Sequence, residues 1–513
     1  MTRLSLALCV AVPLVIWHFF KSRRALPLPP GPPRKLFAGN LRDWPQIKPW
    51  LGFMEMAKKY GDLISLQVLN RRIVVLSSAK AATELLNSRA NIYSDRPHTW
   101  MLSHLAGQAE SMFVMSSLDQ RFPTYRKMLA AGMNRRAVVS PAYRRVVEAR
   151  LCALLRGLAQ LADDDKSEEA AGQLVQLLSA YSGGIALKIA YGYDVTEPTS
   201  QDYFVDLINR ADDAIPSLII PFYFVEIFPF LRFLPKWLSF HRIAAEKKKI
   251  LDAMAYVPYE WAKKQIQTGS PEPSFFSQHY LSRDEPLTAA DENTLMWTSS
   301  SMYNGAAHTT TAVITTFFLV MSTHPDVQKA AQAEIDQLTE YARLVSSDDR
   351  AAGALPYITA IMKEVLRWAP VAPLGLRHRV TQDDIYEGYL IPKGSIVVAN
   401  IWAITHDPEL YPDPSKFDPS RFIGDSPQRD PFDFAFGFGR RVCPGEKLAQ
   451  ETIYLAFANT LALFDISPAL DAAGKDVDPM EALDWRTGIV TLATNFGFRL
   501  TPRSKEALAL AEA

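Results

Sequence analysis

The chain has 513 residues, and 48% of them are hydrophobic, which is enough for a large buried core. Lys and Arg together number 55, as do Asp and Glu, so the formal net charge is zero and no net field favours nucleic acid. The cysteines Cys9, Cys152 and Cys443 are odd in number and far apart, which argues against a disulfide framework, favours a reducing compartment and leaves too few thiols for a zinc site.

The N-terminal run differs from the rest of the chain. Residues 4–20, LSLALCVAVPLVIWHFF, carry no formal charge and reach the short end of the roughly 17–25 residues that span a bilayer. Basic residues at 21–24 follow directly, which places the chain after them on the cytoplasmic side. A cleaved signal peptide can have the same length, but the charge cluster that precedes such a run is missing. We therefore expect a transmembrane anchor over residues 1–25 and a stiff linker, PLPPGPP, at 27–33.

The body of the chain is expected to be mainly α with a small β-sheet region. No repeat, low-complexity tract or second linker interrupts it, so residues 26–513 are predicted to form one domain. Long helical patterns at 291–323 and 355–368 dominate. The short strand signals are at 63–69, 71–78 and 394–402.

The predicted helix at 291–323 is unusual in its middle. Gly305, Ala306 and Ala307 are small, so they leave room beside the helix for another molecule. Small residues at a crossing of two helices would look the same. Acidic residues at its start and His324-Pro325 at its end set its limits.

The segment FGFGRRVCPG, at 436–445, surrounds Cys443 with glycine and arginine just before an apolar helical run. Backbone N–H groups and the dipole at a helix start stabilise a thiolate. A nucleophilic cysteine would want a nearby histidine base, and a buried structural cysteine would need no such neighbours. A thiolate that ligates haem iron suits both neighbours, because a flat cofactor approaches the backbone closely and its propionates need cations.

The same segment resembles the Phe-x-x-Gly-x-Arg-x-Cys-x-Gly signature of the cytochrome P-450 superfamily of haem-thiolate monooxygenases. The resemblance covers nearly the whole chain, since an anchor, a proline hinge, a long central helix and a Glu-x-x-Arg helix precede the loop in the family's order. The chain is most similar to membrane-bound fungal enzymes of secondary metabolism. The resemblance implies the cytochrome P-450 fold, with one large haem domain, and haem b ligated by Cys443. The matching residues are Phe436, Gly439, Arg441, Cys443 and Gly445.

The resemblance also assigns residues to the haem propionates. Arg441, Arg126 and His378 would bind these carboxylates, because charge-assisted hydrogen bonds are strong. Without the resemblance, Arg126 would fit a solvated helix position. Phe122 stands where the family usually has tryptophan, and its ring has no N–H, so one propionate contact is in question.

A Glu-x-x-Arg pair lies in KEVLR. Glu364 and Arg367 share one helix face, and alone such a pair is common and worth about 0.2–0.5 kcal/mol. In the family it joins a third arginine, and Arg421 in FDPSRF is at the matching place. The resemblance implies that this triad fixes the cysteine loop.

Above the iron the resemblance implies a proton relay. Matching GAAHTT to the family's Ala-Gly-x-Asp-Thr-Thr places Thr309 at the threonine that passes protons, and His308 where an acid is expected. Successive helix residues differ by about 100°, so Thr309, Thr310 and Thr311 cannot all face the haem. His308 either feeds protons or only hydrogen-bonds within the helix bundle or to substrate.

The apolar, aromatic segment at 215–238 exceeds what one amphipathic helix needs. In the family this region dips into the membrane and roofs the pocket, which implies a lipophilic substrate, here a terpenoid or a polyketide. Individually, the residues matched to the substrate site are more often core. They are Trp100, Met101, Phe113, Ala372, Leu374, Leu376 and Ile489.

The implied function is hydroxylation or another oxidation by activated dioxygen. Only 70 residues follow Cys443, too few for a flavin domain, so electrons would come from a separate NADPH-dependent cytochrome P-450 reductase. The implied location is the endoplasmic reticulum membrane, single-pass, with the catalytic domain facing the cytosol. The alternatives are a haem-thiolate isomerase or dehydratase that needs no dioxygen, and a haem carrier or sensor. Thr309 and the apolar access region argue against both.

Overall fold

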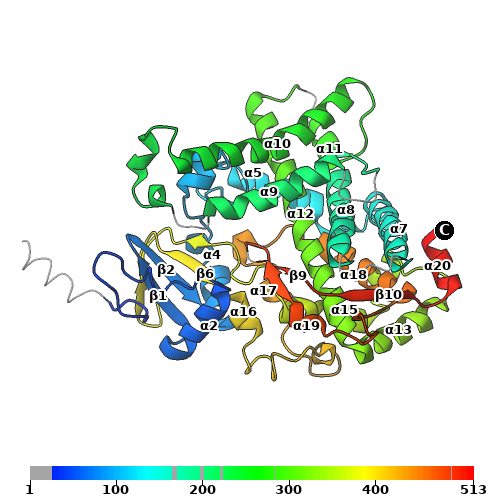
Figure 1. Ribbon diagram of the computed structural model, residues 1–513. Coiled ribbons are helices and arrows are strands. Elements are labelled where there is room, and N and C mark those ends of the chain that lie inside the picture. The colour runs from blue at the N-terminus through cyan, green and yellow to red at the C-terminus, as the bar shows by residue number, and fades with distance from the viewer. Residues whose placement is uncertain are drawn as a thin grey trace, which may run out of the picture.

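Helix α12 (Ala289–Thr323) runs through the middle of the molecule, and the other long helices surround it (Figure 1). Thr288 caps its first turn by accepting a hydrogen bond from the amide of Asp291. It packs mainly against α8 (Ala170–Tyr191) and also against α18 (Glu446–Leu463) in the largest hydrophobic core. The computed structural model describes residues 26–163, 170–196, 202–219, 223–282, 285–486 and 488–512.

Among the described helices, α12 is the one long and apolar enough to cross a membrane, but 78% of its most apolar window is buried inside the protein. It is therefore a core helix. The anchor expected over residues 1–25 lies outside the described residues.

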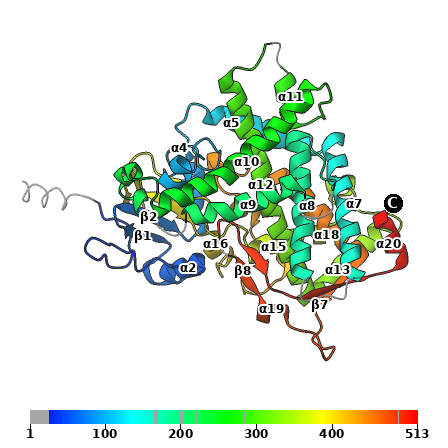
Figure 2. The ribbon, with the colours of Figure 1, turned by 45° about the horizontal axis from the view of Figure 1, so that its top comes forward.

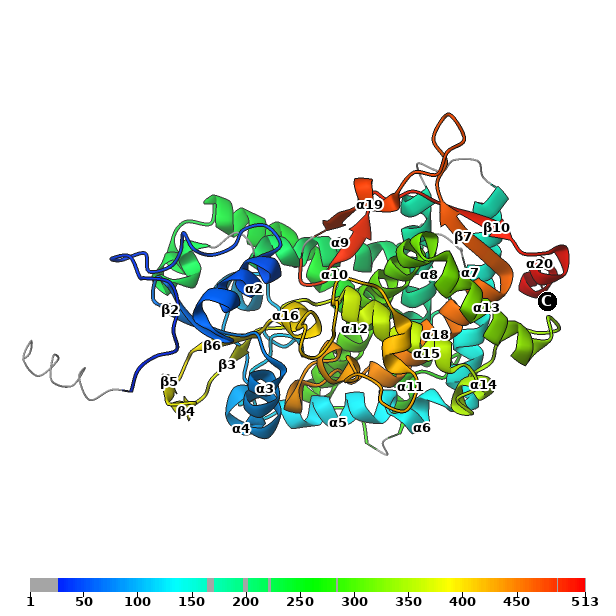
Figure 3. The ribbon, with the colours of Figure 1, turned by 90° about the horizontal axis from the view of Figure 1, so that it is seen from below.

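A four-stranded sheet lies at one end of the molecule, away from the α8 and α18 side (Figure 3). Its strand order is β1-β2-β6-β3. β1 and β2 form an antiparallel hairpin, β2 runs parallel to β6, and β6 is antiparallel to β3. The strands are β1 (Leu63–Val68), β2 (Arg71–Leu76), β6 (Ile396–Ala399) and β3 (His378–Arg379).

Both faces of this sheet are covered. Val74 and Leu76 of β2 enter one hydrophobic cluster, while Ile73 and Val75 enter another. This alternation follows from the two-residue period of a strand, and it explains why the strand signals contain nearly continuous apolar runs.

Two helices lie side by side across α12 (Figure 2). They are α9 (Tyr203–Ile219) and α10 (Ser239–Gln267). The chain between them contains the short 3₁₀ helices η3 (Phe224–Glu226) and η4 (Pro229–Phe233).

The prediction of a mainly helical fold with a small sheet is confirmed. The expected helices are α12 and α15 (Pro356–Trp368), and the first two strand signals are β1 and β2. The strand expected over 394–402 is wrong in its second half, because β6 ends at Ala399. Asn400 then accepts a hydrogen bond from the amide of Ala403 (3.2 Å) and starts helix α16 (Ile401–Thr405).

The remaining described elements are short strands and helices. The strands form three two-stranded sheets, β4 (Asp384–Tyr386) with β5 (Tyr389–Ile391), β7 (Phe464–Pro468) with β10 (Phe498–Pro502), and β8 (Asp484–Arg486) with β9 (Leu492–Thr494). The helices are α2 (Pro49–Tyr60), α3 (Ala79–Ala82), η1 (Thr83–Ser88), α4 (Ala90–Tyr93), η2 (Trp100–Leu105), α5 (Phe122–Met133), α6 (Arg135–Val138), α7 (Pro141–Asp163), α11 (Phe275–Leu281), α13 (Pro325–Thr339), α14 (Ser347–Ala351), η5 (Pro419–Phe422), α17 (Phe432–Ala435), η6 (Gly439–Arg441), α19 (Pro479–Ala482) and α20 (Lys505–Glu512).

Candidate functional site

The loop before α18 is held in one shape by close packing against η1. Gly439 has φ 52°, and a Cβ there would lie 2.3 Å from the carbonyl oxygen of Leu86 in η1, so only glycine fits. Within the loop the amide of Cys443 donates to the carbonyl of Phe436 (2.7 Å). The loop therefore presents Cys443 in a fixed position.

The thiol of Cys443 lies deep in the protein, although the residue as a whole has exposed surface. Burial raises the pKa of this thiol, while hydrogen bonds from the amides of Gly445 and Glu446 at the start of α18 lower it. Yet the residue is exposed. A side chain deep in the protein that still has free surface lines an internal space. No histidine hydrogen-bonds to this thiol in the described part of the chain, so a nucleophile with a histidine base has no support.

The middle of α12 has free surface on one side. Thr310 and Thr311 are buried, and Thr309 donates a hydrogen bond from Oγ1 to the carbonyl of Gly305 (2.9 Å). The ring of Phe113 lies 3.4 Å from where a Cβ on Gly305 would stand. The partly exposed residues of this stretch are Gly305, Ala306, His308 and Thr309.

Positive charge gathers beside the cysteine loop. Burial, and next the charge of Arg96, lower the pKa of Arg441 to about 8, and Arg126 and Arg440 act in the same direction. Burial also lowers the pKa of Arg126, while the charge of Cys443 raises it. Arg126 has no hydrogen bond or ion pair within the described residues. An unpaired guanidinium thus stands near the thiol.

Arg96 is 7% exposed and lies next to this group. Its Nη1 donates to the carbonyls of Leu376 and Arg377, at 2.8 Å each, but its Nε is buried without a partner. Burial lowers the pKa of Arg96 to about 10. A buried donor without a partner is costly, so an acceptor is expected here.

The guanidinium of Arg441 donates hydrogen bonds to backbone carbonyls. It donates to the carbonyls of Ser94 (2.8 Å), Met112 (3.1 Å) and Met115 (2.6 Å). Its guanidinium lies 4.1 Å from the ring centroid of Phe122. The phenyl ring at the position of the family's tryptophan therefore forms a cation–π contact with Arg441.

His378 is a buried neutral imidazole. Its Nδ1 lies 2.7 Å from the carbonyl oxygen of Tyr93, so Nδ1 carries the hydrogen. Burial, and next the charge of Arg96, lower the pKa of His378 to about 3.

The structure brings Glu364, Arg367 and Arg421 together beneath the loops. Arg367 donates to both carboxylate oxygens of Glu364 (2.6 and 2.8 Å), and both side chains are fully buried. Arg421 Nε lies 3.4 Å from Glu364 Oε1. The two arginines also donate to five carbonyls of residues 405–416, so the triad fixes this stretch of loop.

Comparison with known proteins decides the family. A family model described as cytochrome P450 matches residues 29–493. The chain belongs to the cytochrome P450 family. It is 36% identical over 491 residues to cytochrome P450 monooxygenase claR of Ampulloclitocybe clavipes, covering 94% of this chain and 87% of that protein. The corresponding values are 36%, 96% and 94% for cytochrome P450 monooxygenase 176 of Postia placenta, and 34%, 99% and 95% for cytochrome P450 monooxygenase ppsD of Aspergillus oryzae.

A P450 of this kind is an oxidoreductase that incorporates oxygen, and its cofactor is haem iron with a cysteine thiolate ligand. The residues around Cys443 fit that group. Cys443 has exposed surface and its sulfur has two amide donors, while Arg126 has no partner within the described residues and Nε of Arg96 is buried without one. Arg96 was missed from the sequence because its carbonyl partners lie about 280 residues away and nothing in SDRPH indicates burial.

His308 contacts α9. Its Nε2 lies 3.3 Å from the carbonyl oxygen of Ile208, and its Nδ1 lies 3.7 Å from Oδ2 of Asp212. Arg486 Nη2 is 3.2 Å from the same carboxylate oxygen. His308 therefore joins α12 to α9 and to the β8–β9 hairpin, and no pattern in the sequence indicated Asp212.

The residues expected to line the substrate site divide into two groups. Met101 is 0% exposed and packs in the core, and Leu374 packs against the cluster on one face of the sheet. Trp100 stacks on His104, with ring centroids 4.6 Å apart. Trp100 and Leu374 are partly exposed, as are Phe113, Ala372, Leu376 and Ile489, so Met101 alone of the seven is buried.

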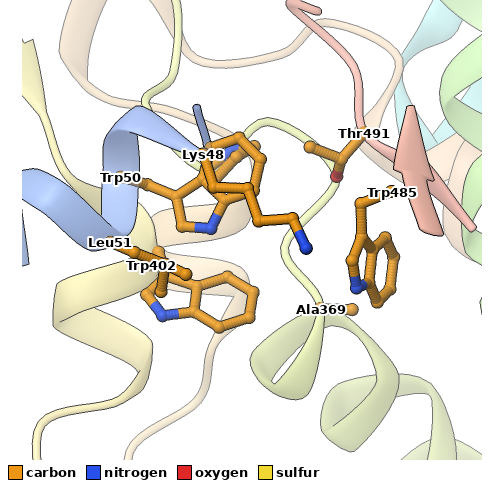
Figure 4. Close-up of a pocket in the computed structure, with 8 residues that line it drawn as sticks. Lys48, Trp50, Leu51, Ala369, Trp402, Trp485 and Thr491 are labelled. Carbon is orange, nitrogen blue, oxygen red and sulfur yellow. The ribbon is translucent and has the colours of Figure 1, made fainter. Parts of the chain in front are cut away.

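A pocket of about 370 Å³, including its open mouth, lies between α2, α16 and β8 (Figure 4). None of the residues expected at the site lines it. Three tryptophans face one another across it, with the ammonium of Lys48 between them. Its lining residues are Lys48, Trp50, Leu51, Ala369, Pro373, Trp402, Trp485 and Thr491.

The buried triad should dominate the stability of the loop region. Arg367→Leu leaves the carboxylate of Glu364 buried and largely unpaired, so we expect a loss of about 3–5 kcal/mol and loss of haem. The control Arg499→Ala breaks a solvent-exposed ion pair with Asp476 and should cost about 0–1 kcal/mol. Unfolding followed by circular dichroism and haem absorbance measures both, and equal losses would contradict the role of the triad.

Proposed function

We propose that this P450 is a haem-thiolate monooxygenase that hydroxylates or otherwise oxidises a lipophilic small molecule, with Cys443 as the axial ligand. One observation carries the proposal, namely that Cys443 has exposed surface although its thiol lies deep in the protein, where the sulfur accepts two amide hydrogen bonds at a helix start. The bound haem supplies the activation of dioxygen and the transfer of an oxygen atom to substrate.

The chain's own residues hold and orient that group. The amides of Gly445 and Glu446 stabilise negative charge on the sulfur of Cys443. Arg96 and Arg126 offer unsatisfied donors for the two propionates, and Arg441 and the neutral imidazole of His378 lie beside them. Phe436, Gly439 and Gly445 give the loop the close approach that a flat cofactor requires.

We further propose that protons enter along α9 and α12. The carboxylate of Asp212 is partly exposed and lies beside the half-exposed Arg486. It is therefore in contact with solvent, which is the source of protons in this proposal. Oδ2 of Asp212 faces Nδ1 of His308, and Thr309, the next residue, holds a proton at Oγ1. In this proposal a carboxylate from α9 takes the place of the acid that the family carries beside the threonine.

Exposed aromatic side chains support a lipophilic substrate and contact with a membrane. They occupy the chain between α9 and α10, at the end of the molecule that holds β1 and β2 (Figure 2), where Glu226 of η3 pairs with Arg71 of β2. Substrate could pass from the lipid to the interior beneath this segment. A fungal terpenoid or polyketide fits this chemistry, since the relatives compared are fungal. The exposed side chains are Phe224, Phe228, Phe230, Phe233, Leu234 and Trp237.

Electrons are proposed to come from an NADPH-dependent cytochrome P450 reductase. Exposed basic residues lie on α5, α6, η6 and the start of α18, all close to Cys443 in the chain or in contact with α18. An acidic flavoprotein surface would be attracted to them. They are Lys127, Arg135, Arg136, Arg440 and Lys447.

The proposed location is the endoplasmic reticulum membrane, with an anchor over residues 1–25 and the haem domain, residues 26–513, in the cytosol. The linker supports a separable anchor, because it docks on the haem domain. The amide of Leu390 donates to the carbonyl of Pro27 (2.8 Å), and that of Ser65 to Pro30 (2.8 Å).

Cys443→His should abolish the strongly red-shifted Soret band that the reduced protein shows with carbon monoxide, because that band requires a thiolate ligand. Cys152→Ser, a change in the half-buried cysteine of α7, should leave the band in place. Absorbance spectra measure both, and persistence of the band in Cys443→His would show that Cys443 is not the thiolate ligand.

The proton route predicts different defects at neighbouring positions. Thr309→Ala should divert NADPH into hydrogen peroxide, whereas the buried Thr310→Ala should do so less. His308→Ala should slow turnover by roughly 100-fold, the lower end of what a proton-transfer group contributes. Peroxide formed per NADPH, measured with reductase present, separates these effects.

His308→Asp should recover little activity, because it sets a second carboxylate against Asp212. The exchange His308→Asp with Asp212→His keeps both groups and should restore turnover. If His308→Ala changes only substrate affinity, His308 is a binding residue and the relay is wrong.

A chain that begins at Pro27 should bind haem and partition less into membranes, since the linker contacts with β1 and β5 both remain. Sedimentation with microsomes and the carbon monoxide spectrum test this. Wholesale loss of haem in the shortened chain would show that the anchor is not separable.

A further inference from the structure

Arg377 lies between the expected substrate-lining Leu376 and strand β3, at the edge of the sheet (Figure 3). Its side chain is only partly exposed. In the part of the chain that the structure describes, its guanidinium has no hydrogen bond and no ion pair. Burial of an unpaired charge is costly, so this arrangement calls for an anion.

Glu226, the acid that acts on Arg377, forms no hydrogen bond or ion pair with it within the described residues. Burial lowers the pKa of Arg377, the charge of Arg71 lowers it further, and the charge of Glu226 raises it, so these two groups are its charged neighbours. Both carboxylate oxygens of Glu226 are already engaged. Oε1 accepts from the amide of Met101 (2.8 Å) and Oε2 from Nη2 of Arg71 (3.0 Å). Two arginines and one glutamate leave one uncompensated positive charge.

This charge is separate from the arginines beside Cys443. The charges of Arg96 and Arg441 lower the pKa of His378, whereas Arg377 is not among the charges that shift this pKa. Successive residues along an extended chain point to opposite sides, so Arg377 and His378 diverge. His378 points toward Tyr93, while Arg377 points toward β2 and η3.

Apolar and aromatic residues neighbour Arg377 in the chain and Glu226 in space. Leu376, which precedes Arg377, is partly exposed, and the amide of Met101, the second residue of η2, donates to Glu226. Trp100, in the same turn, lies under Arg232 of η4, with the guanidinium carbon 4.2 Å from the ring centroid. A molecule that reaches this region meets apolar side chains and two guanidinium groups that have no ion pair within the described residues, Arg377 and Arg232, of which Arg232 lies on the ring of Trp100.

We propose that the substrate is a lipophilic acid whose carboxylate is bound by Arg377. The inference rests on the proposed function and specifies its substrate class. A guanidinium offers two parallel N–H donors to a carboxylate, which selects an acid over its ester. The apolar remainder of the molecule would extend past Leu376 toward α12.

Spectral titration of the full-length holoenzyme tests the proposal, with dodecanoic acid and methyl dodecanoate as probes that differ only in charge. The shift of the Soret band on binding gives a dissociation constant for each. We expect the acid to bind about tenfold more tightly than the ester, or better. Arg377→Gln should remove this difference, and Arg377→Lys should keep most of it.

Arg72→Gln is the matched control. Arg72 is the next residue of β2 after Arg71, points to the other face of the sheet and contacts Gln67 (3.4 Å), so its loss should leave the acid preference unchanged. Equal binding of acid and ester, or a preference that survives in Arg377→Gln, overturns the proposal. Loss of haem from Arg377→Gln assigns the guanidinium to the cofactor and also overturns it. The carbon monoxide band of the unaltered protein tests the proposed function separately.

Discussion

In the proposed haem site, the sulfur of Cys443 has to carry negative charge inside a protein interior that favours the neutral thiol. Burial raises the pKa of this group, and the structure opposes that tendency with two amide hydrogen bonds, the start of α18 and the charge of Arg126. These groups are useful only while the loop keeps its shape. The loop geometry is thus the condition on which the candidate site depends.

Two kinds of contact maintain the loop. Gly439 lets η1 pack so closely that any side chain would collide with the carbonyl of Leu86. Further from the sulfur, Glu364, Arg367 and Arg421 hold the preceding loop through a buried network of charged hydrogen bonds. Such networks contribute little net stability compared with apolar packing, but breaking one partner is expensive, so they enforce one arrangement.

The sequence predicted the helical class, α12, α15, the β1–β2 hairpin and a loop that presents Cys443 at a helix start. These features have local signals, because periodicity, glycine and proline act within a few residues. The strand predicted over 394–402 was wrong in its second half, because Asn400 caps the start of α16 there and this outweighs the β propensity of the branched residues that follow. Arg96, Asp212 and Arg377 were not predicted, because their importance depends on burial and on partners far away in the chain.

The arginines beside Cys443 have a consequence for how the protein matures. Arg96 and Arg126 bring positive charge and unmet donors into the interior, and Arg441 adds a third charge among backbone carbonyls. When the polypeptide folds without haem, the mutual repulsion of these charges lowers the stability of the native state. A dianionic ligand that binds only the folded chain shifts the equilibrium toward the native state by mass action. With the haem propionates bound to these arginines as proposed, cofactor supply and correct folding are coupled, and the cellular abundance of the protein should follow haem availability.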